Sequence, residues 1–179
     1  MDWNVILTVK PDPRGAYGLL GALRRFGQFS RTSFRDVCVG SVADIDGLLD
    51  GIRSAREAGK PWALRVARVI PAETMFSFTP EIFADRLKEA VTPLVARLTD
   101  GSFCVRLERR GLIGKLMSQE IERTVGEHVH SLATAQGKQI RTEFDNPDFV
   151  IAIETLGQQC GVALLVRALR ERYPFVQVH

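Results

Sequence analysis

The chain has 179 residues, of which 45% are hydrophobic and 25% charged, and 24 Lys and Arg against 21 Asp and Glu give a net charge of +3. This composition is that of an ordinary globular protein and excludes disordered, collagen-like and coiled-coil chains. The three cysteines lie far apart without a Cys-x-x-Cys pair, so the sequence predicts structural cysteines rather than a disulfide framework or a zinc ribbon.

The first 71 residues alternate strand-like and helix-like patterns. Alternating or dense apolar residues predict strands over residues 3–9, 34–42 and 62–70. Apolar residues at helical spacing predict helices over residues 19–26 and 44–59. Asp44 is a good N-cap for the second helix, and Gly59 ends it. The order β-α-β-α-β indicates a small α/β layer with helices on one side of a sheet.

The two halves of the chain are joined by residues 71–78, which show no clear period and are expected to form a linker. Thr79, followed by a proline, predicts the start of a helix. Phe78 and Phe83 stand at the spacing of a hydrophobic staple across this start. The helix is expected to kink at Pro93.

The second half again alternates strands with helices. Strands are expected over residues 102–108, 139–144, 149–156 and 160–166. A long amphipathic helix is expected between the first two strands, with a buried stripe of Met117, Ile121, Val125, Val129 and Leu132. A short helix is expected over residues 167–173.

None of the usual catalytic constellations occurs in the sequence. His128 and His130 stand two residues apart on a helix, whereas a helical metal pair needs a spacing of three or four. No phosphate-binding P-loop and no nucleophile elbow is present. The sequence therefore predicts no catalytic residue, no metal and no cofactor.

The most informative stretch is residues 106–115, in which four cations stand against one acid. It leaves a strand, passes through a turn containing Gly111 and Gly114, and enters a helix. Glycines let backbone N–H groups point outward, and a helix N-terminus adds partial positive charge, so this turn is suited to hold phosphate. The expected phosphate contacts are Arg109, Arg110 and Lys115, with Arg106, Arg123, Lys138 and Arg141 as second-rank candidates. The alternative, an exposed strand end followed by an ordinary solvated turn, stays open.

Charge is unevenly placed along the second half. Residues 102–141 hold seven cations and four acids, whereas residues 142–154 hold four acids and no cation. This polarity favours one basic surface over a uniformly charged protein.

Three motifs stand together after Phe78. A strand ends in Arg109, Arg110 and Gly111; a helix carries Glu122, Arg123, Val125 and Gly126; and the run Phe144, Asp145, Asn146, Pro147 and Asp148 leads into a strand with Val150, Ile151, Ile153 and Glu154. This pattern resembles a THUMP domain. The first half, from Asp2-Trp3-Asn4-Val5 to Arg68-Val69-Ile70-Pro71, resembles the ferredoxin-like domain that accompanies THUMP modules.

The resemblance implies an α/β protein with a ferredoxin-like domain at residues 1–71 and a THUMP-like RNA-binding domain at residues 72–179. The whole chain is similar to the stand-alone THUMP proteins akin to the adaptor of tRNA cytidine acetylation. In tRNA-modifying relatives this fold holds the acceptor arm and the 3′ end, and chemistry belongs to another domain or protein. The implied partners are tRNA or another structured RNA and an acetyltransferase-like, tRNA-modifying enzyme.

The predicted function is therefore RNA binding, with tRNA as the favoured partner, in support of modification by a separate enzyme. Contacts to RNA shape and backbone are expected to dominate over contacts to bases, because most aromatic residues lie on predicted core faces. Two alternatives stay open: a protein-binding adaptor for an RNA-modifying acetyltransferase, and a small enzyme acting alone. A KH-like reader, prompted by Gly111-Leu112-Ile113-Gly114, is disfavoured because this loop follows a strand.

A cytoplasmic protein with no membrane partner is expected. No uncharged apolar run approaches the roughly 18 residues of a membrane helix. The first ten residues, which include Asp2 and Lys10, lack the pattern of a signal peptide.

Overall fold

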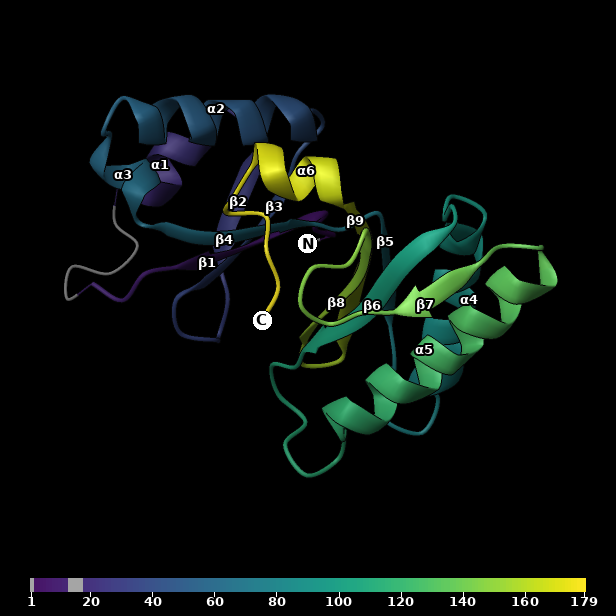
Figure 1. Cartoon of the computed structure of the whole chain (residues 1–179). Helices are drawn as coiled ribbons and strands as arrows, with labels where there is room; N and C mark the ends of the chain where they lie inside the picture. Colours follow the sequence, from purple (N-terminus) through teal and green to yellow (C-terminus); the bar gives the residue numbers. More distant parts are fainter. Residues whose placement is uncertain (1, 13–17) are drawn as a thin grey trace. The chain divides into compact units, whose positions relative to one another are not determined.

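The computed structural model describes residues 2–12 and 18–179, and the chain divides into two compact units (Figure 1). Unit 1 comprises Met1–Ala72 and Arg170–Gln177, and unit 2 comprises Glu73–Leu169 and Val178–His179. The mixed α/β class predicted from the sequence is confirmed, since both units combine a sheet with helices.

Unit 1 contains a four-stranded antiparallel sheet in the order β2-β3-β1-β4. Its elements are, in chain order, β1 (Val5–Val9), α1 (Leu19–Leu23), β2 (Gln28–Arg31), β3 (Val37–Ser41), α2 (Ile45–Glu57), α3 (Pro61–Leu64) and β4 (Val66–Pro71). Apart from the single turn of α3, this is the βαββαβ arrangement of ferredoxin-like proteins.

Unit 1 differs from the predicted pattern in several elements. α1 ends at Leu23 rather than residue 26, and β3 begins at Val37 rather than residue 34. β2 is an added strand that pairs with β3, and none of its side chains is fully buried, so its apolar alternation is weak. The strand expected from residue 62 begins only at Val66, because Pro61 occupies the first position of α3. The predicted cap of α2 is confirmed: the Gly47 N–H donates to Asp44 Oδ1 at 2.8 Å.

Unit 2 contains a five-stranded sheet in the order β5-β9-β8-β6-β7. Its elements are β5 (Thr74–Ser77), α4 (Phe83–Val95), β6 (Gly101–Glu108), α5 (Ser118–Ala135), β7 (Ile140–Thr142), β8 (Phe149–Leu156) and β9 (Gln159–Val166), and α6 (Arg167–Arg172) follows. β6 runs parallel to both β7 and β8, whereas β9 runs antiparallel to β8 and β5.

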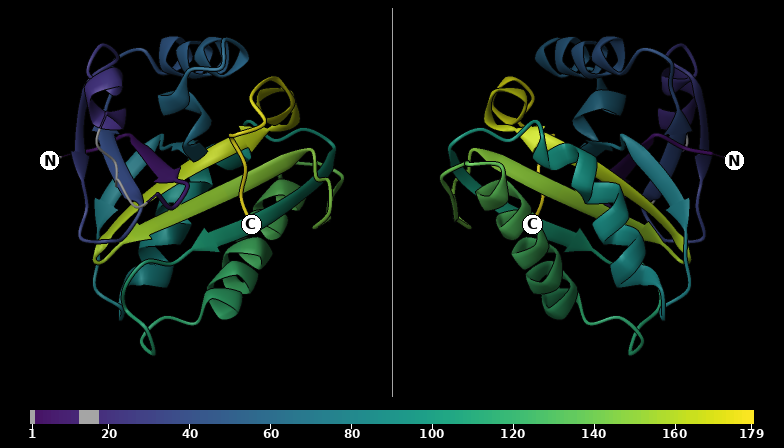
Figure 2. Two further views of the ribbon diagram at one scale, coloured as in Figure 1. Left: turned by 90° about the vertical axis from the view of Figure 1, so that its left-hand side faces the viewer. Right: turned by 90° about the vertical axis from the view of Figure 1, so that its right-hand side faces the viewer.

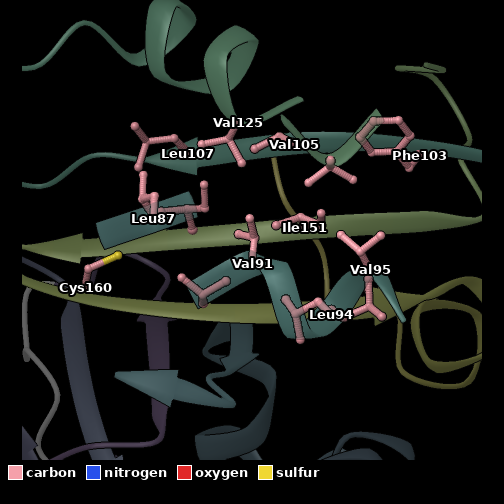
Figure 3. Close-up of a cluster of buried hydrophobic side chains, with 14 of the residues drawn as sticks. Leu87, Val91, Leu94, Val95, Phe103, Val105, Leu107, Val125, Ile151 and Cys160 are labelled. Carbon is pink, nitrogen blue, oxygen red and sulfur yellow. The ribbon is translucent and has the colours of Figure 1, made fainter. Parts of the chain in front are cut away.

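The core of unit 2 lies between one face of this sheet and the helices α4 and α5, which cover that face side by side (Figure 2). Figure 3 shows Leu87 and Val91 of α4 packed with Val105 of β6, Val125 of α5 and Ile151 of β8. Leu87, Val91, Val125 and Ile151 are fully buried. This packing fixes β6 and α5 against each other, and the loop between these two elements carries Arg109, Arg110 and Lys115.

Unit 2 departs from the sequence-based expectations at its start. The expected linker contains β5, an edge strand that pairs with β9 and buries none of its side chains fully. α4 begins at Phe83 rather than after Thr79, because residues 79–82 form a turn closed by a hydrogen bond from the Ile82 N–H to Thr79 O at 3.2 Å. The expected contact between Phe78 and Phe83 is present, with stacked rings 4.0 Å apart between centroids.

Pro93 lies inside α4, which continues to Val95. None of the helices within the described ranges combines the length and the apolar character that crossing a membrane requires.

Candidate functional site

Residues 109–117, the β6–α5 loop, connect the end of β6 to the start of α5. Gly111, Leu112 and Gly114 take left-handed backbone conformations, with φ of 90°, 53° and 76°. Such angles cost little for glycine and more for a residue with a side chain. The Lys115 and Leu116 N–H groups donate to Leu112 O at 3.0 and 3.2 Å, which closes the loop into a compact turn. The glycines therefore form the tight turn that the sequence predicts.

Two of the expected phosphate contacts, Arg109 and Lys115, stand on this loop, and neither has an acidic hydrogen-bond partner within residues 2–12 and 18–179. Arg109 Nη1 donates to Gly111 O at 2.9 Å, and its buried Nε has no hydrogen-bond partner among the described residues. A buried N–H left without an acceptor is costly, and no acid among the described residues neutralises the Arg109 guanidinium by a hydrogen bond. Lys115 is exposed. A hydrogen bond from Thr79 lowers the pKa of Glu81, and the charge of Lys115 lowers it further.

Arg110, the third expected phosphate contact, is largely buried and already paired with an acid. Its Nη1 forms an ion pair with Glu154, its Nη2 lies 3.9 Å from Glu108 Oε1, and its side chain is only 9% exposed. The Arg110 N–H donates to Thr155 Oγ1 at 3.0 Å, and its carbonyl accepts from the Gly157 N–H at 2.9 Å. Arg110 therefore joins the end of β6 to the β8–β9 hairpin with its charge already compensated, which argues against a phosphate contact.

The two second-rank cations near β7, Lys138 and Arg141, lie in different environments. Lys138 Nζ donates to Val95 O at the end of α4, where a cation interacts favourably with the helix dipole. Lys138 is half-buried and holds this helix end. Arg141 lies exposed on β7. Of these two cations, only Arg141 is well placed for an external ligand.

A groove of about 500 Å³, the α5 groove, lies between α5 and β6. Phe103, Cys104 and Val105 of β6 line it, together with residues of α5 from Gln119 to Ser131. At 1.5 Å per residue that face of α5 extends over about 18 Å. The groove falls within the range of about 300–1,000 Å³ typical of ligand sites.

The α5 groove is open because β7 is short. β7 pairs with Gly101–Phe103 of β6, and in the part of the chain that the structure describes no strand pairs with the later part of β6 on that side. The edge is partly satisfied by α5, since the Leu107 N–H donates to Glu122 Oε1 at 2.7 Å. Arg123, one of the second-rank cations, lines the groove and is exposed.

Phe144, at the rim of the α5 groove, is 58% exposed. The Arg106 guanidinium carbon lies 5.2 Å from the Phe144 ring centroid, and Arg106 Nη2 donates to Phe144 O at 3.3 Å. Phe144 was not among the expected site residues, because the strand was expected to continue to residue 144, whereas β7 ends at Thr142. Its position between Glu143 and Asp145, in an acidic turn-like run, is the signal that could have identified it.

Six of the expected site residues form two groups that adjoin along the chain, and Arg110, Lys138 and Arg141 belong to neither. Arg109, Gly111, Gly114 and Lys115 belong to the β6–α5 loop, which ends at residue 117. Arg123 lines the α5 groove, and Arg106 holds Phe144 at its rim. Because the groove begins at Gln119, in the first turn of α5, the loop stands at one end of the groove.

Asp148 fixes the strands beside the groove. Its Oδ2 accepts hydrogen bonds from the N–H and the hydroxyl of Ser102, both at 2.9 Å, and its Oδ1 pairs with Arg167 Nη2 at 3.0 Å. These hydrogen bonds from Ser102, followed by the charge of Arg167, lower the pKa of Asp148.

This lowered pKa predicts acid-dependent stability. Ionised Asp148 stabilises the fold above its unfolded pKa of about 4, and this contribution is lost as the pH falls through the lower folded pKa. We expect Asp148→Asn to have a lower Tm than the wild type at neutral pH, and the difference to shrink below about pH 4. Circular dichroism melts across this range test the expectation, and a difference independent of pH would contradict it.

Most of unit 2 matches the model of a known protein family. Residues 82–165 match the family model for the THUMP domain. No curated protein matches the sequence.

Solved structures match over most of the chain. TrmN from Thermus thermophilus matches with a TM-score of 0.61 and 19% identity, over 89% of this chain and 45% of that protein. PH1313 from Pyrococcus horikoshii Ot3 matches with a TM-score of 0.58 and 14% identity, over 90% of this chain and 54% of that protein. A 4-thiouridine synthetase in complex with RNA and ATP matches with a TM-score of 0.55 and 16% identity, over 92% of this chain and 41% of that protein. These identities show a shared fold, and this chain spans about half the length of the matched proteins.

Proposed function

The chain carries a THUMP domain at residues 82–165, and from this premise we propose that the protein binds RNA, with tRNA as its partner. Two cations on the β6–α5 loop carry the proposal: Arg109 has no acidic hydrogen-bond partner among the described residues, and Lys115 is exposed. RNA backbones present the anionic oxygens that both side chains can bind. One protein of the same fold is described in complex with RNA.

The start of α5 supports the same proposal. Among the described residues, no side chain caps the first turn of this helix, which begins after Met117 at the end of the loop. The N–H groups of an uncapped first turn attract anions. Glu120 adds one acid to this turn, so binding is expected to depend on Arg109 and Lys115 for its positive charge.

We further propose that the protein supports tRNA modification by a separate, acetyltransferase-like enzyme rather than catalysing it. Burial raises the pKa of the Cys38 and Cys160 thiols, which disfavours the thiolate that a cysteine nucleophile needs. The adaptor role, the cytoplasmic location and the domain division at 1–71 and 72–179 remain predictions from the sequence. Modification of tRNA by the purified chain alone would favour the enzyme alternative.

The combined substitution Arg109→Gln and Lys115→Gln is expected to weaken tRNA binding about tenfold at low salt, because two phosphate contacts are lost. The slope of log K against log salt should fall by about two. Fluorescence anisotropy with labelled tRNA, measured over a salt series, gives both quantities.

A matched control removes two cations from a different part of unit 2. Lys88→Gln lies on α4, and Arg97→Gln lies just after it, where Arg97 pairs with Glu73. This control has the same net charge as the loop variant and should keep most of the wild-type affinity. Equal losses in the two double variants would argue for general charge attraction and against a site on the loop.

A further inference from the structure

Residues Arg170–Gln177, the strap, belong to unit 1 although unit 2 separates them from β4 in the sequence. The side chains of Tyr173, Phe175 and Val176 are buried, so the strap is a packed part of the structure. Unit 1 is therefore built from two segments of the chain, and the second segment adds to a sheet that the first one forms.

The strap lies along the edge of the unit 1 sheet. β4 is the last strand in the order β2-β3-β1-β4, so among the described residues one of its sides has no neighbouring strand. On that side the Val69 N–H donates to Phe175 O at 2.9 Å. Arg56 of α2 supports the same contact, because its Nη1 donates to Val66 O at 2.7 Å and its guanidinium carbon lies 5.6 Å from the Phe175 ring centroid. The strap therefore covers an edge that would otherwise be open.

Asp50 of α2 anchors the strap through side chains. Its Oδ1 accepts a hydrogen bond from the Tyr173 hydroxyl at 2.6 Å, and it lies 3.3 Å from Arg172 Nη2 and 3.4 Å from Arg53 Nη2. The hydrogen bond from Tyr173, followed by the charge of Arg172, lowers the pKa of Asp50. The carboxylate is therefore ionised at neutral pH and remains a strong acceptor.

The strap is attached to the sheet more weakly than a strand would be. Among the described residues, one backbone hydrogen bond joins it to β4, whereas β1 pairs with β4 from Val5 to Val9. Side chains supply the rest of its attachment. A segment held in this way can open locally while the sheet behind it stays folded.

β4 has little protection of its own against pairing with another chain. Its sequence is Val-Ala-Arg-Val-Ile-Pro, and its charged residue, Arg68, is buried. Natural proteins protect edge strands with exposed charges or with a covering segment. Because β4 lacks an exposed charge, its protection falls to the strap.

We propose that the strap is a releasable cover of the β4 edge, and that its release lets β4 pair with β4 of a second copy of the chain. Two copies present identical, mainly apolar strands, which can pair across a twofold axis. The strap is thus an internal contact that keeps the protein from associating with itself. This inference goes beyond the proposed RNA binding and does not depend on it.

Phe175→Ala tests the strap, because it removes a buried ring from the strap and leaves the β6–α5 loop unchanged. Phe78→Ala is the matched control, since Phe78 is 4% exposed against 3% for Phe175 but belongs to the core of unit 2. Tyr173→Phe is a milder variant that keeps the ring and removes the hydroxyl that donates to Asp50. It tests the same contact if Phe175→Ala fails to fold.

Hydrogen–deuterium exchange of the full chain, measured on peptides from β4 and β8, shows whether the edge opens. We expect Phe175→Ala to speed exchange in β4 about tenfold and to leave β8 unchanged, with a smaller change in the same direction for Tyr173→Phe. Phe78→Ala should not speed exchange in β4 relative to β8.

Light scattering over a concentration series shows whether the opened edge pairs. The average mass of Phe175→Ala should rise with concentration, whereas that of the wild type should stay constant. Adding Ala67→Lys places a charge on β4 and should restore a constant mass while exchange in β4 stays fast. Unchanged exchange in β4, equal acceleration in β4 and β8, or fast exchange without self-association would each overturn the inference.

Discussion

Glu154→Gln is expected to lower the free energy of unfolding by about 3 kcal/mol, because it leaves the Arg110 guanidinium charged, buried and without its principal partner. The Glu154 side chain is 2% exposed and that of Arg110 is 9% exposed. Glu108 cannot replace the lost carboxylate, since its Oε1 lies 3.9 Å from Arg110 Nη2 and its side chain is 37% exposed. Glutamine keeps the volume of the side chain, so the substitution tests the charge.

Urea unfolding followed by circular dichroism measures this loss. Trp3 and Trp62 both lie in unit 1, so tryptophan fluorescence follows that unit separately. The double substitution Arg110→Met with Glu154→Leu removes both charges and should recover most of the stability, because a buried ion pair contributes little net free energy. A double variant no more stable than Glu154→Gln would contradict this account of the ion pair.

The same ion pair decides how RNA binding can be tested. Replacing both Arg109 and Arg110 with glutamate would place a second carboxylate against Glu154, and like charges in a buried site are strongly unfavourable. If that variant failed to bind RNA, the cause could be unfolding or the loss of a phosphate contact, and the experiment would not separate them. The Arg109 and Lys115 substitutions avoid this confusion, since neither side chain forms an ion pair with an acid in the described structure.

The sequence predicted the fold best where one face of an element is fully buried. β8 matches its expected range, and β6 and β9 begin one residue earlier than expected, because long buried strands carry dense apolar residues. β2 and β5 were missed for the opposite reason. Each has four residues, none of them fully buried, and is held mainly by backbone hydrogen bonds to one neighbouring strand. Backbone hydrogen bonds form whatever the side chains are, so they produce no periodic pattern of apolar residues in the sequence.

The candidate site was predictable in part for a related reason. A run of cations and glycines between a strand and a helix is visible locally, and the loop takes the expected left-handed turns. Which arginine is compensated depends on a partner 44 residues away, brought close when β6 pairs with β8 and places Glu108 beside Glu154. The exposure of Phe144 likewise depends on where β7 stops, and strand ends are poorly encoded in local patterns.

Gly101→Ala is expected to lower the free energy of unfolding by about 3 kcal/mol, through two effects that act at the same position. Gly101 has a φ of 145°, a conformation that residues with a side chain rarely adopt. A Cβ built there would lie 2.5 Å from Asp148 Oδ2, so the carboxylate would have to move. That movement would break its hydrogen bonds to the Ser102 N–H and hydroxyl, which hold the start of β6 to the start of β8.

Gly137→Ala is the matched control, because Gly137 also has a positive φ, of 77°, but has open space where its Cβ would lie. Backbone strain alone should cost about 1 kcal/mol there. Equal losses in urea unfolding for the two variants would contradict a role for the Asp148 clash. If the clash operates, Asp148→Asn should cost less stability in the Gly101→Ala background than in the wild type, because the hydrogen bonds that it weakens are already broken. The Gly101→Ala protein should also lose the part of its acid sensitivity that comes from Asp148, since a displaced carboxylate no longer has a lowered pKa.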